Sequence, residues 1–292
     1  MLRRFAMLVL FAFCPTAVSA QAPKGAAMPE GTKVSKDVAY GDHTRNKLDV
    51  FAPPSEKPLP LVIWIHGGGW EAGSKENNPV VALLDKGYAV AGINYRYSTQ
   101  APFPAQLHDC QAAIRFLRDN AKKYNIDGDR IGVWGASAGG HLVSLLGTAG
   151  DVPELDGDPN SKTSVKVQAV LNWFGPTDLT KMVKPGAETP GVFVKLLGGS
   201  LKDKADLAKS ANPITHVTKN DAPFLIVHGD NDPLVPLSQS EILHAALKKA
   251  GVATELVVFP KAGHGDGPFR AAVMKDDHRK VMLDFFGKHL KP

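Results

Sequence analysis

The chain has 292 residues, of which 43% are hydrophobic and 22% are charged, and its formal net charge is +5 at pH 7. This length and composition exclude a disordered chain and provide enough apolar residues for a large core. Lysines and acidic residues are interspersed rather than gathered in runs. The positive charge therefore does not indicate a nucleic-acid partner.

The first 20 residues have the pattern of a secretory signal peptide. Arg3 and Arg4 give a basic start, residues 5–13 are apolar, and the stretch ends in the small residues Val18-Ser19-Ala20. The apolar run is too short to span a bilayer, and the pattern predicts cleavage at its end. We therefore expect a secreted or periplasmic protein without a membrane anchor.

Residues 21–33 are rich in Ala, Pro and Gly and predict a flexible lead-in. Residues 34–292 show no repeat and no second composition, which predicts one domain. The expected strands are 34–40, 47–51, 59–65, 88–95, 131–134, 167–173, 224–228 and 254–259. The expected helices are 78–86, 104–123, 138–147, 238–250 and one running through 282–288. This alternation predicts an α/β fold with a mostly parallel central sheet, helices on both faces and an edge hairpin at its start.

Two stretches interrupt the alternation. Residues 151–166 are polar, and residues 181–221 are mixed, with scattered Pro and Gly, as in a small cap or loop insertion. We expect both above the strand ends, where ligands bind in open α/β sheets. Asp156, Asp158 and Asn160 resemble the start of a calcium loop, but the required Gly and Glu are missing. No metal site is predicted, and cation binding by this loop is left open.

The motif Gly135-Ala136-Ser137-Ala138-Gly139 follows an expected strand and begins an expected helix. In that context a G-x-S-x-G sequence indicates a nucleophile elbow, in which serine sits on a sharp turn that only flanking glycines allow. The alternative is a glycine-rich turn that contains a serine by chance. The candidate partners of Ser137 decide between the two.

A second motif, His66-Gly67-Gly68-Gly69-Trp70, follows the buried strand at residues 59–65. Three glycines after a strand let backbone N–H groups turn toward a ligand. The amides of Gly67, Gly68 and Ala138 are therefore candidates for an oxyanion hole. The alternative is a flexible loop.

The candidate acid and base follow the last two expected strands. Asp230 and Asp232 lie just beyond residues 224–228; we expect Asp230 to tie the turn and Asp232 to orient a histidine. His264, flanked by glycines, follows residues 254–259, and we expect the other histidines to be structural. The order Ser137, Asp232, His264 is that of α/β-hydrolases.

With these motifs in place, the chain resembles the α/β-hydrolase esterases with an HGGGW oxyanion loop. The resemblance is closest to the branch of bifunctional feruloyl and acetyl-xylan esterases, and more distant to the hormone-sensitive-lipase-like group, whose N-terminal helical cap has no counterpart here. It runs from about Tyr40 to the C-terminus. It rests on the segments Ile65–Trp70, Ile93–Tyr97, Phe103–Ala105, Ile126–His141 and Phe174–Asp178.

The resemblance implies a secreted serine carboxylesterase with Ser137, Asp232 and His264 as its triad and no cofactor. It also implies that Trp70, Trp173 and Phe174 border the acyl pocket. We expect hydrolysis of short-chain or aromatic acyl esters, including esters carried by polysaccharides. The alternatives are a lipase, a serine peptidase of the prolyl-oligopeptidase type and a non-catalytic binding module.

Strand and helix positions also predict a structural ion pair. Arg96 ends the strand beside the one that feeds the glycine loop, and Asp109 begins the next helix. We therefore expect their charged groups to meet near the oxyanion loop.

Overall fold

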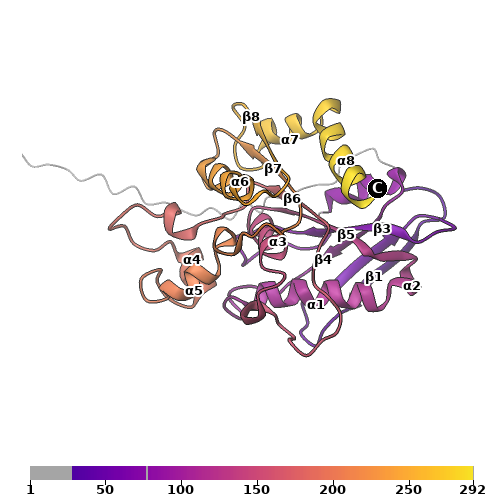
Figure 1. Cartoon of the computed structure of the whole chain (residues 1–292), viewed down its shortest axis with the longest axis horizontal. Helices are drawn as coiled ribbons and strands as arrows, with labels where there is room; N and C mark the ends of the chain where they lie inside the picture. The colour runs from indigo at the N-terminus through magenta and orange to yellow at the C-terminus, as the bar shows by residue number, and fades with distance from the viewer. Residues whose placement is uncertain (1–27, 77, 292) are drawn as a thin grey trace, which may run out of the picture.

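The computed structural model describes residues 28–76 and 78–291 (Figure 1). The predicted signal peptide, and with it the expected cleavage site, lies outside the described residues. Eight strands form one sheet in the order β1-β2-β4-β3-β5-β6-β7-β8. The strands are β1 (Lys33–Ala39), β2 (Lys47–Ala52), β3 (Leu59–Ile65), β4 (Ala89–Ile93), β5 (Ile126–Ala136), β6 (Ala169–Trp173), β7 (Phe224–Gly229) and β8 (Thr254–Phe259).

Strand direction follows the prediction of an edge hairpin on a mostly parallel sheet. β1 pairs with β2, and β2 with β4, in antiparallel fashion, whereas β4, β3, β5, β6, β7 and β8 pair in parallel. Parallel strands place their carboxyl ends at one edge of the sheet, and the segments that follow β3, β5, β7 and β8 therefore meet there. The predicted α/β-hydrolase fold class is confirmed.

Helices cover both faces of the sheet, with α1 and α8 on opposite sides in Figure 1. The α-helices are α1 (Ala105–Asp119), α2 (Ala121–Tyr124), α3 (Ala138–Thr148), α4 (Gly191–Leu197), α5 (Ala205–Ser210), α6 (Ser238–Ala250), α7 (Gly267–Val273) and α8 (Asp276–Leu290). The 3₁₀ helices are η1 (Pro79–Lys86), η2 (Pro153–Leu155), η3 (Leu179–Met182) and η4 (Pro213–His216).

Two hydrophobic cores result from the alternation of side chains along the strands. In β3, Leu61, Ile63 and Ile65 pack with α1, α3 and α6, whereas Val62 and Trp64 pack with η1, α7 and α8. Every residue of β3 is buried. A strand buried on both faces requires the continuous apolar sequence that this segment has.

Within the insertion, which was predicted as a small cap or a loop, the structure has short helices. The insertion carries α4 and α5, which have seven and six residues, together with the end of η3 and all of η4. α7 is a further helix that the sequence did not indicate. Elements of two turns or fewer show too little periodicity to be read from a pattern.

The acidic loop at residues 151–166 is attached to α1 by an ion pair. Nη2 of Arg115 lies 2.7 Å from both carboxylate oxygens of Asp156. The carboxylate that resembled the first ligand of a calcium loop thus already has a cationic partner. Over the described residues, His, Cys, Asp and Glu side chains form no group of three or more placed to hold a metal ion.

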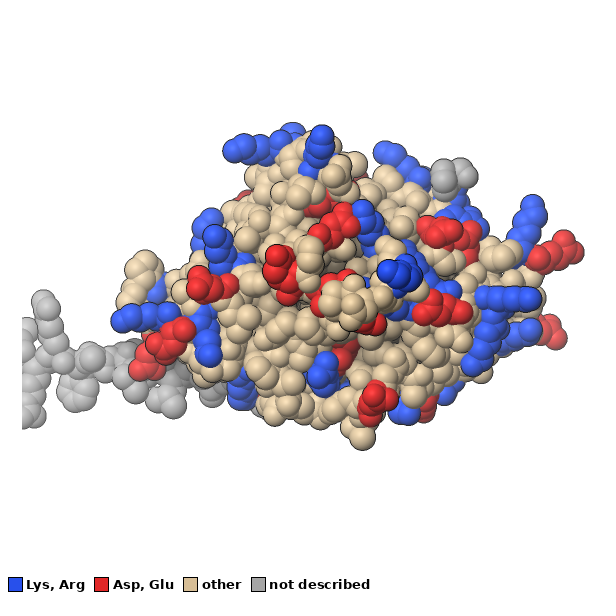
Figure 2. Space-filling model, turned by 60° about the horizontal axis from the view of Figure 1, so that its bottom comes forward, with Lys and Arg blue, Asp and Glu red and all other residues tan. Residues whose placement is uncertain are grey.

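The molecular surface carries both signs of charge. Figure 2 shows acidic and basic side chains interspersed over the visible face, with no field of one sign. This distribution agrees with the interspersed charges of the sequence. Within residues 28–76 and 78–291, no helix combines the length and apolar character needed to cross a membrane.

Candidate active site

Ser137 occupies a sharp turn between β5 and α3. Its backbone has φ 55° and ψ −120°, a combination that L-residues adopt only under strain. A Cβ placed on Gly135 would lie 2.3 Å from the carbonyl oxygen of Gly139, and one placed on Gly139 would lie 2.0 Å from that of Ile65. Both glycines are therefore required by close backbone approach, as the nucleophile-elbow interpretation predicts.

Three side chains from three loops form one hydrogen-bonded chain. Oγ of Ser137, after β5, lies 2.8 Å from Nε2 of His264, after β8. Nδ1 of His264 lies 2.7 Å from Oδ2 of Asp232, after β7. A carboxylate only accepts, so Nδ1 of His264 carries a proton and Nε2 is free to accept the serine proton. The structure thus brings together the three residues predicted as a triad.

The Asp232 carboxylate is buried and receives several donors. Its Oδ1 accepts from the amides of Leu234 and Val235 at 2.8 and 2.9 Å, and its Oδ2 lies 3.2 Å from Nε2 of His228. Burial alone would raise the pKa of Asp232, but the hydrogen bonds from His228, His264 and Val235 outweigh it and hold the pKa well below its ordinary value. Asp232 is therefore ionised beside His264.

Asp230 has a different partner. Its Oδ1 accepts from the amide of Lys261 at 2.6 Å, and its own amide donates to the carbonyl of Phe259 at 3.1 Å. The Asp230 side chain thus connects the loop after β7 to the end of β8. This is the turn-tying position expected for it.

The predicted oxyanion loop lies against the nucleophile. A Cβ on Gly67 would lie 3.2 Å from Cβ of Ser137, and Gly68 has φ 108°. Among the described residues, the amides of Gly67 and Gly68 find no intramolecular acceptor. Ala138 is the first residue of α3, so its amide has no partner in the helix either. These three amides are available to an anion, and their role as an oxyanion hole stays a prediction.

The three predicted pocket residues are all buried, with exposed fractions of 2% for Trp70, 7% for Trp173 and 2% for Phe174. Phe174 packs on the ring of His264, with 4.5 Å between the centroids. Trp173 packs with Trp64 and its neighbours in the core on the η1, α7 and α8 side. Their position in the structure is that of packing residues, and their contact with an acyl group stays a prediction.

Trp70 instead connects the oxyanion loop to the elbow helix. Its Nε1 donates to Nδ1 of His141 at 3.2 Å, and Nε2 of His141 donates to the carbonyl of Ala211 at 2.7 Å. Burial lowers the pKa of His141 to about 4, so this ring is neutral at pH 7. The oxyanion loop, α3 and the insertion are thereby held in one hydrogen-bonded series.

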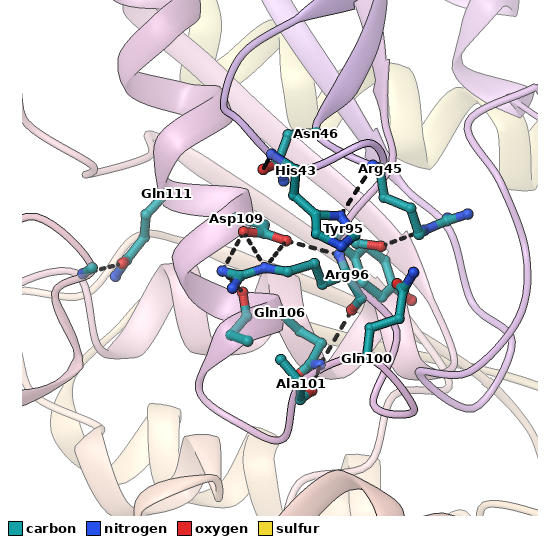
Figure 3. Close-up of polar contacts among 12 residues, drawn as sticks. His43, Arg45, Asn46, Tyr95, Arg96, Gln100, Ala101, Gln106, Asp109 and Gln111 are labelled. Atoms are coloured by element: carbon teal, nitrogen blue, oxygen red, sulfur yellow. Dashed lines mark hydrogen bonds and ion pairs between the residues drawn. The ribbon is translucent and has the colours of Figure 1, made fainter.

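The expected ion pair between Arg96 and Asp109 is present (Figure 3). Nη2 of Arg96 lies 2.6 Å from Oδ1 of Asp109, and Nε of Arg96 lies 2.9 Å from Oδ2. The amide of Arg96 also donates to Oδ2 at 2.8 Å. The carboxylate therefore fixes both the side chain and the backbone after β4.

The insertion contributes contacts that the sequence did not indicate. Phe193 of α4 packs on Trp70 with 6.2 Å between the ring centroids. The side chain of Val192 lies against Gly69, where a Cβ on the glycine would contact it. Lys195 pairs with Glu71 at 2.6 Å. One short helix thus covers the oxyanion loop. In the sequence this segment is marked only by its apolar residues, Val192-Phe193-Val194 and Leu196-Leu197.

His228 is a further residue beside the triad. Oγ of Ser240 lies 2.6 Å from its Nδ1, and its Nε2 lies 2.8 Å from the carbonyl of Val235. We expected His228, like the other histidines outside the triad, to be structural, and its bond to the Val235 carbonyl agrees with that role. Its additional contact with Asp232 depends on the path of the loop and has no signature in the sequence.

Comparisons with known proteins find similarity to esterases. The profile of the BD-FAE family matches residues 48–247. The esterase LipQ of Mycobacterium tuberculosis is 34% identical over 268 residues, which cover 87% of this chain and 62% of that protein. The esterase LipC of the same organism is 30% identical over 239 residues, covering 78% and 59%. The chain thus spans about 60% of the length of these curated relatives.

Two solved structures are similar over most of this chain. A truncated form of a carbohydrate esterase from gut microbiota has 32% identity and a TM-score of 0.79, covering 91% of this chain and all of that one. A bifunctional GH43-CE protein of Bacteroides eggerthii has 37% identity and a TM-score of 0.80, covering 88% of this chain and 38% of that one.

Proposed function

The chain belongs to the BD-FAE family of α/β-hydrolase esterases, and from this premise we propose that it is a serine carboxylesterase acting on short-chain or aromatic acyl esters, including esters carried by polysaccharides. One observation carries the proposal. The hydrogen-bonded chain from Ser137 through His264 to Asp232 lies beside amides that have no acceptor within the part of the chain that the structure describes. A nucleophile with its base and a site for an oxyanion is the apparatus of acyl transfer.

The acylation step uses only groups of this chain. Ser137 Oγ attacks the ester carbonyl carbon while its proton passes to Nε2 of His264. Asp232 stabilises the imidazolium that forms, and the amides of Gly67, Gly68 and Ala138 donate to the negative oxygen of the tetrahedral intermediate. The C–O bond to the alcohol breaks as His264 returns the proton to the leaving oxygen. The acyl group is then bound to Ser137.

Deacylation repeats these steps with water. His264 takes a proton from water, the hydroxide oxygen attacks the acyl carbon, and the bond to Ser137 Oγ breaks as His264 returns the proton to it. The acid leaves and the free enzyme is restored. Every proton transfer occurs at Nε2 of His264, which lies within hydrogen-bond distance of Oγ.

The insertion supports a short or aromatic acyl group rather than a lipid. Val194 is the one large hydrophobic side chain exposed among the described residues of the insertion, at 38%. A lipase lid needs a sizeable apolar patch to engage a lipid surface. The likeness to a carbohydrate esterase supports a sugar-bearing alcohol portion, and the N-terminal sequence pattern supports secretion to meet an extracellular polymer.

A substrate panel tests the proposal. We expect kcat/KM on p-nitrophenyl esters to be highest for short acyl chains and to fall as the chain lengthens, with release of acetate or ferulate from xylan. The Ser137→Ala variant, which we expect to keep the fold, is the control for background hydrolysis. A maximum at long chains without release from polymer would indicate a lipase, and preferential cleavage of prolyl peptides would indicate a peptidase.

A further inference from the structure

The two amides offered by the glycine loop each share a peptide group with a carbonyl. The amide of Gly67 belongs to the peptide that carries the His66 carbonyl, and the amide of Gly68 to the peptide that carries the Gly67 carbonyl. In a trans peptide the C=O and N–H bonds point to opposite sides. A donor that holds one of these carbonyls therefore also sets the direction of the amide.

Both carbonyls are held by side chains. The Tyr95 hydroxyl donates to the His66 carbonyl at 2.9 Å. Nδ1 of His66 lies 2.7 Å from the Gly67 carbonyl oxygen. The rings of His66 and Tyr95 stack at 4.4 Å between centroids and 15° between planes. The amides of Gly67 and Gly68 are thus directed away from this ring pair.

The contacts of His66 define one tautomer. A carbonyl oxygen can only accept, so Nδ1 must carry the proton. Burial lowers the pKa of His66 to about 4, which leaves Nε2 bare at pH 7. The group that meets Nε2 is Nη2 of Arg45, 3.4 Å away. Because a guanidinium has no acceptor, it favours the tautomer with a bare Nε2.

Arg45 itself is fixed on the loop between β1 and β2. Its Nε donates to the Tyr95 carbonyl at 2.7 Å, and Nη2 also lies 3.3 Å from the Gly73 carbonyl. The guanidinium carbon lies 3.6 Å from the centre of the Tyr97 ring. Figure 3 shows the Arg45 side chain extending to the Tyr95 backbone. Its position is therefore set by groups outside the glycine motif.

Space around His66 is also closed. A Cβ on Gly73 would lie 2.6 Å from Nδ1 of His66 and 2.4 Å from the Gly67 carbonyl oxygen. His66 is buried, with only 3% of the whole residue exposed. The imidazole thus has little freedom to rotate or to exchange its partners.

We propose that Arg45 is a positioning residue of the oxyanion hole: it holds His66 in the Nδ1–H tautomer, and His66 and Tyr95 in turn aim the amides of Gly68 and Gly67. The proposal rests on the proposed esterase function for its kinetic consequences. It assigns a role in the reaction to a residue that is outside the triad and outside the HGGGW motif, and that touches neither substrate nor reacting atoms.

Kinetics of matched variants provide the first test. We expect Arg45→Met to lower kcat about tenfold while KM stays within about twofold, because misaimed amides weaken the transition state more than the bound ester. Arg118→Met is the control, since Arg118 also donates to backbone carbonyls, including Gly128 at 2.8 Å, but at the far end of α1. It should leave kcat within about twofold.

Substitutions of His66 separate positioning from packing. Asn can present its amide nitrogen to the Gly67 carbonyl, whereas Leu cannot donate. We expect His66→Leu to lower kcat about a hundredfold and His66→Asn to recover most of that loss. A folded Arg45→Met or His66→Leu variant with wild-type kcat, or equal losses in the Asn and Leu variants, would overturn the proposal.

A nitrogen-15 NMR spectrum of the histidine rings gives a readout independent of activity. We expect wild-type His66 at pH 7 as the Nδ1–H tautomer and the Nε2–H form to become populated in Arg45→Met. An Nε2–H tautomer in the wild type would overturn the Arg45 assignment. A wild type that hydrolyses no ester would overturn the proposed function instead, and the tautomer would then decide the link between Arg45 and His66 alone.

Discussion

At the scale of single residues, Asp230 and Asp232 show how position separates two identical side chains. Asp232 is buried, receives amides on one oxygen and faces His264 with the other. Asp230 is exposed and accepts from the amide of Lys261. The two carboxylates are only two positions apart in the same loop. Their different surroundings nevertheless allow Asp232 to stabilise an imidazolium, whereas Asp230 only ties a turn.

The contrast gives a paired prediction. Asp232→Asn should lower kcat about 10⁴-fold, because an amide NH₂ facing Nδ1 of His264 favours the wrong tautomer. Asp230→Asn should change kcat less than about threefold, because the Asn carbonyl can still accept from Lys261. Steady-state kinetics on one short-chain ester measure both, and the reverse order of the two losses would exchange their roles.

The sequence was sufficient to predict that Ser137, Asp232 and His264 meet, because each of them is tied to a strand end by glycine-rich or turn-forming neighbours. It was insufficient for His228 and Phe174, which contact Asp232 and His264 across loops. Such contacts depend on how loops from different strands pack together, and no local sequence pattern predicts this packing. The burial of Trp70 and Trp173 depends on the same packing and has no local signature in the sequence either.

At the scale of elements, α1 is attached to the segment after β4 by one carboxylate. Asp109 is buried and receives the amide, Nε and Nη2 of Arg96. This arrangement followed from strand order, since Arg96 follows β4, which pairs with β3, and Asp109 lies in the first turns of α1. It was predictable because the elements involved are long and their order is fixed by a parallel sheet.

We expect Asp109→Asn to reduce the free energy of unfolding by about 2 kcal/mol, since it leaves a partly buried guanidinium without its counter-charge. Asp119→Asn, in the same helix, is the control: its carboxylate is exposed and accepts from the Thr163 hydroxyl, so its cost should be below about 1 kcal/mol. Urea unfolding monitored by circular dichroism compares the two. Equal losses would contradict a special role for the pair.

The insertion was the part of the fold that the sequence predicted least well. α4 and α5 have seven and six residues and are stabilised by docking rather than by periodic apolar faces. Phe193 packs α4 on Trp70, and Lys195 pairs it with Glu71. Tertiary contact thus decides the structure of these segments.

At the scale of the whole molecule, burial of neutral histidines makes stability depend on pH. Burial lowers the pKa of both His66 and His141 to about 4, against about 6.5 in an unfolded chain. Between these values the unfolded state binds more protons than the folded state, so stability is full above about pH 6.5 and is lost as the pH falls toward 4. Each group contributes at most about 1.4 kcal/mol per pH unit in this window.

We therefore expect the free energy of unfolding in urea to decrease between pH 7 and pH 5. His141→Gln should lower the number of protons taken up on unfolding by about one, and with it the slope of the free energy of unfolding against pH. The reason is that Gln can accept from Trp70 and donate to the Ala211 carbonyl without titrating. The quantity compared is the slope with pH, which is separate from any constant loss of stability. An unchanged slope in the variant would show that His141 is not the titrating group.

The central claim is that Ser137 is the nucleophile of an ester hydrolase, and covalent labelling with a p-nitrophenyl phosphonate ester tests it most directly. We expect the wild-type protein to take up one phosphonyl group per chain, with loss of esterase activity in proportion, and peptide mass spectrometry to place the group on Ser137. The Ser137→Ala variant should fold, remain unlabelled and be about 10⁴-fold less active. Stoichiometric labelling at another residue, or an active and labelled Ser137→Ala variant, would contradict the account.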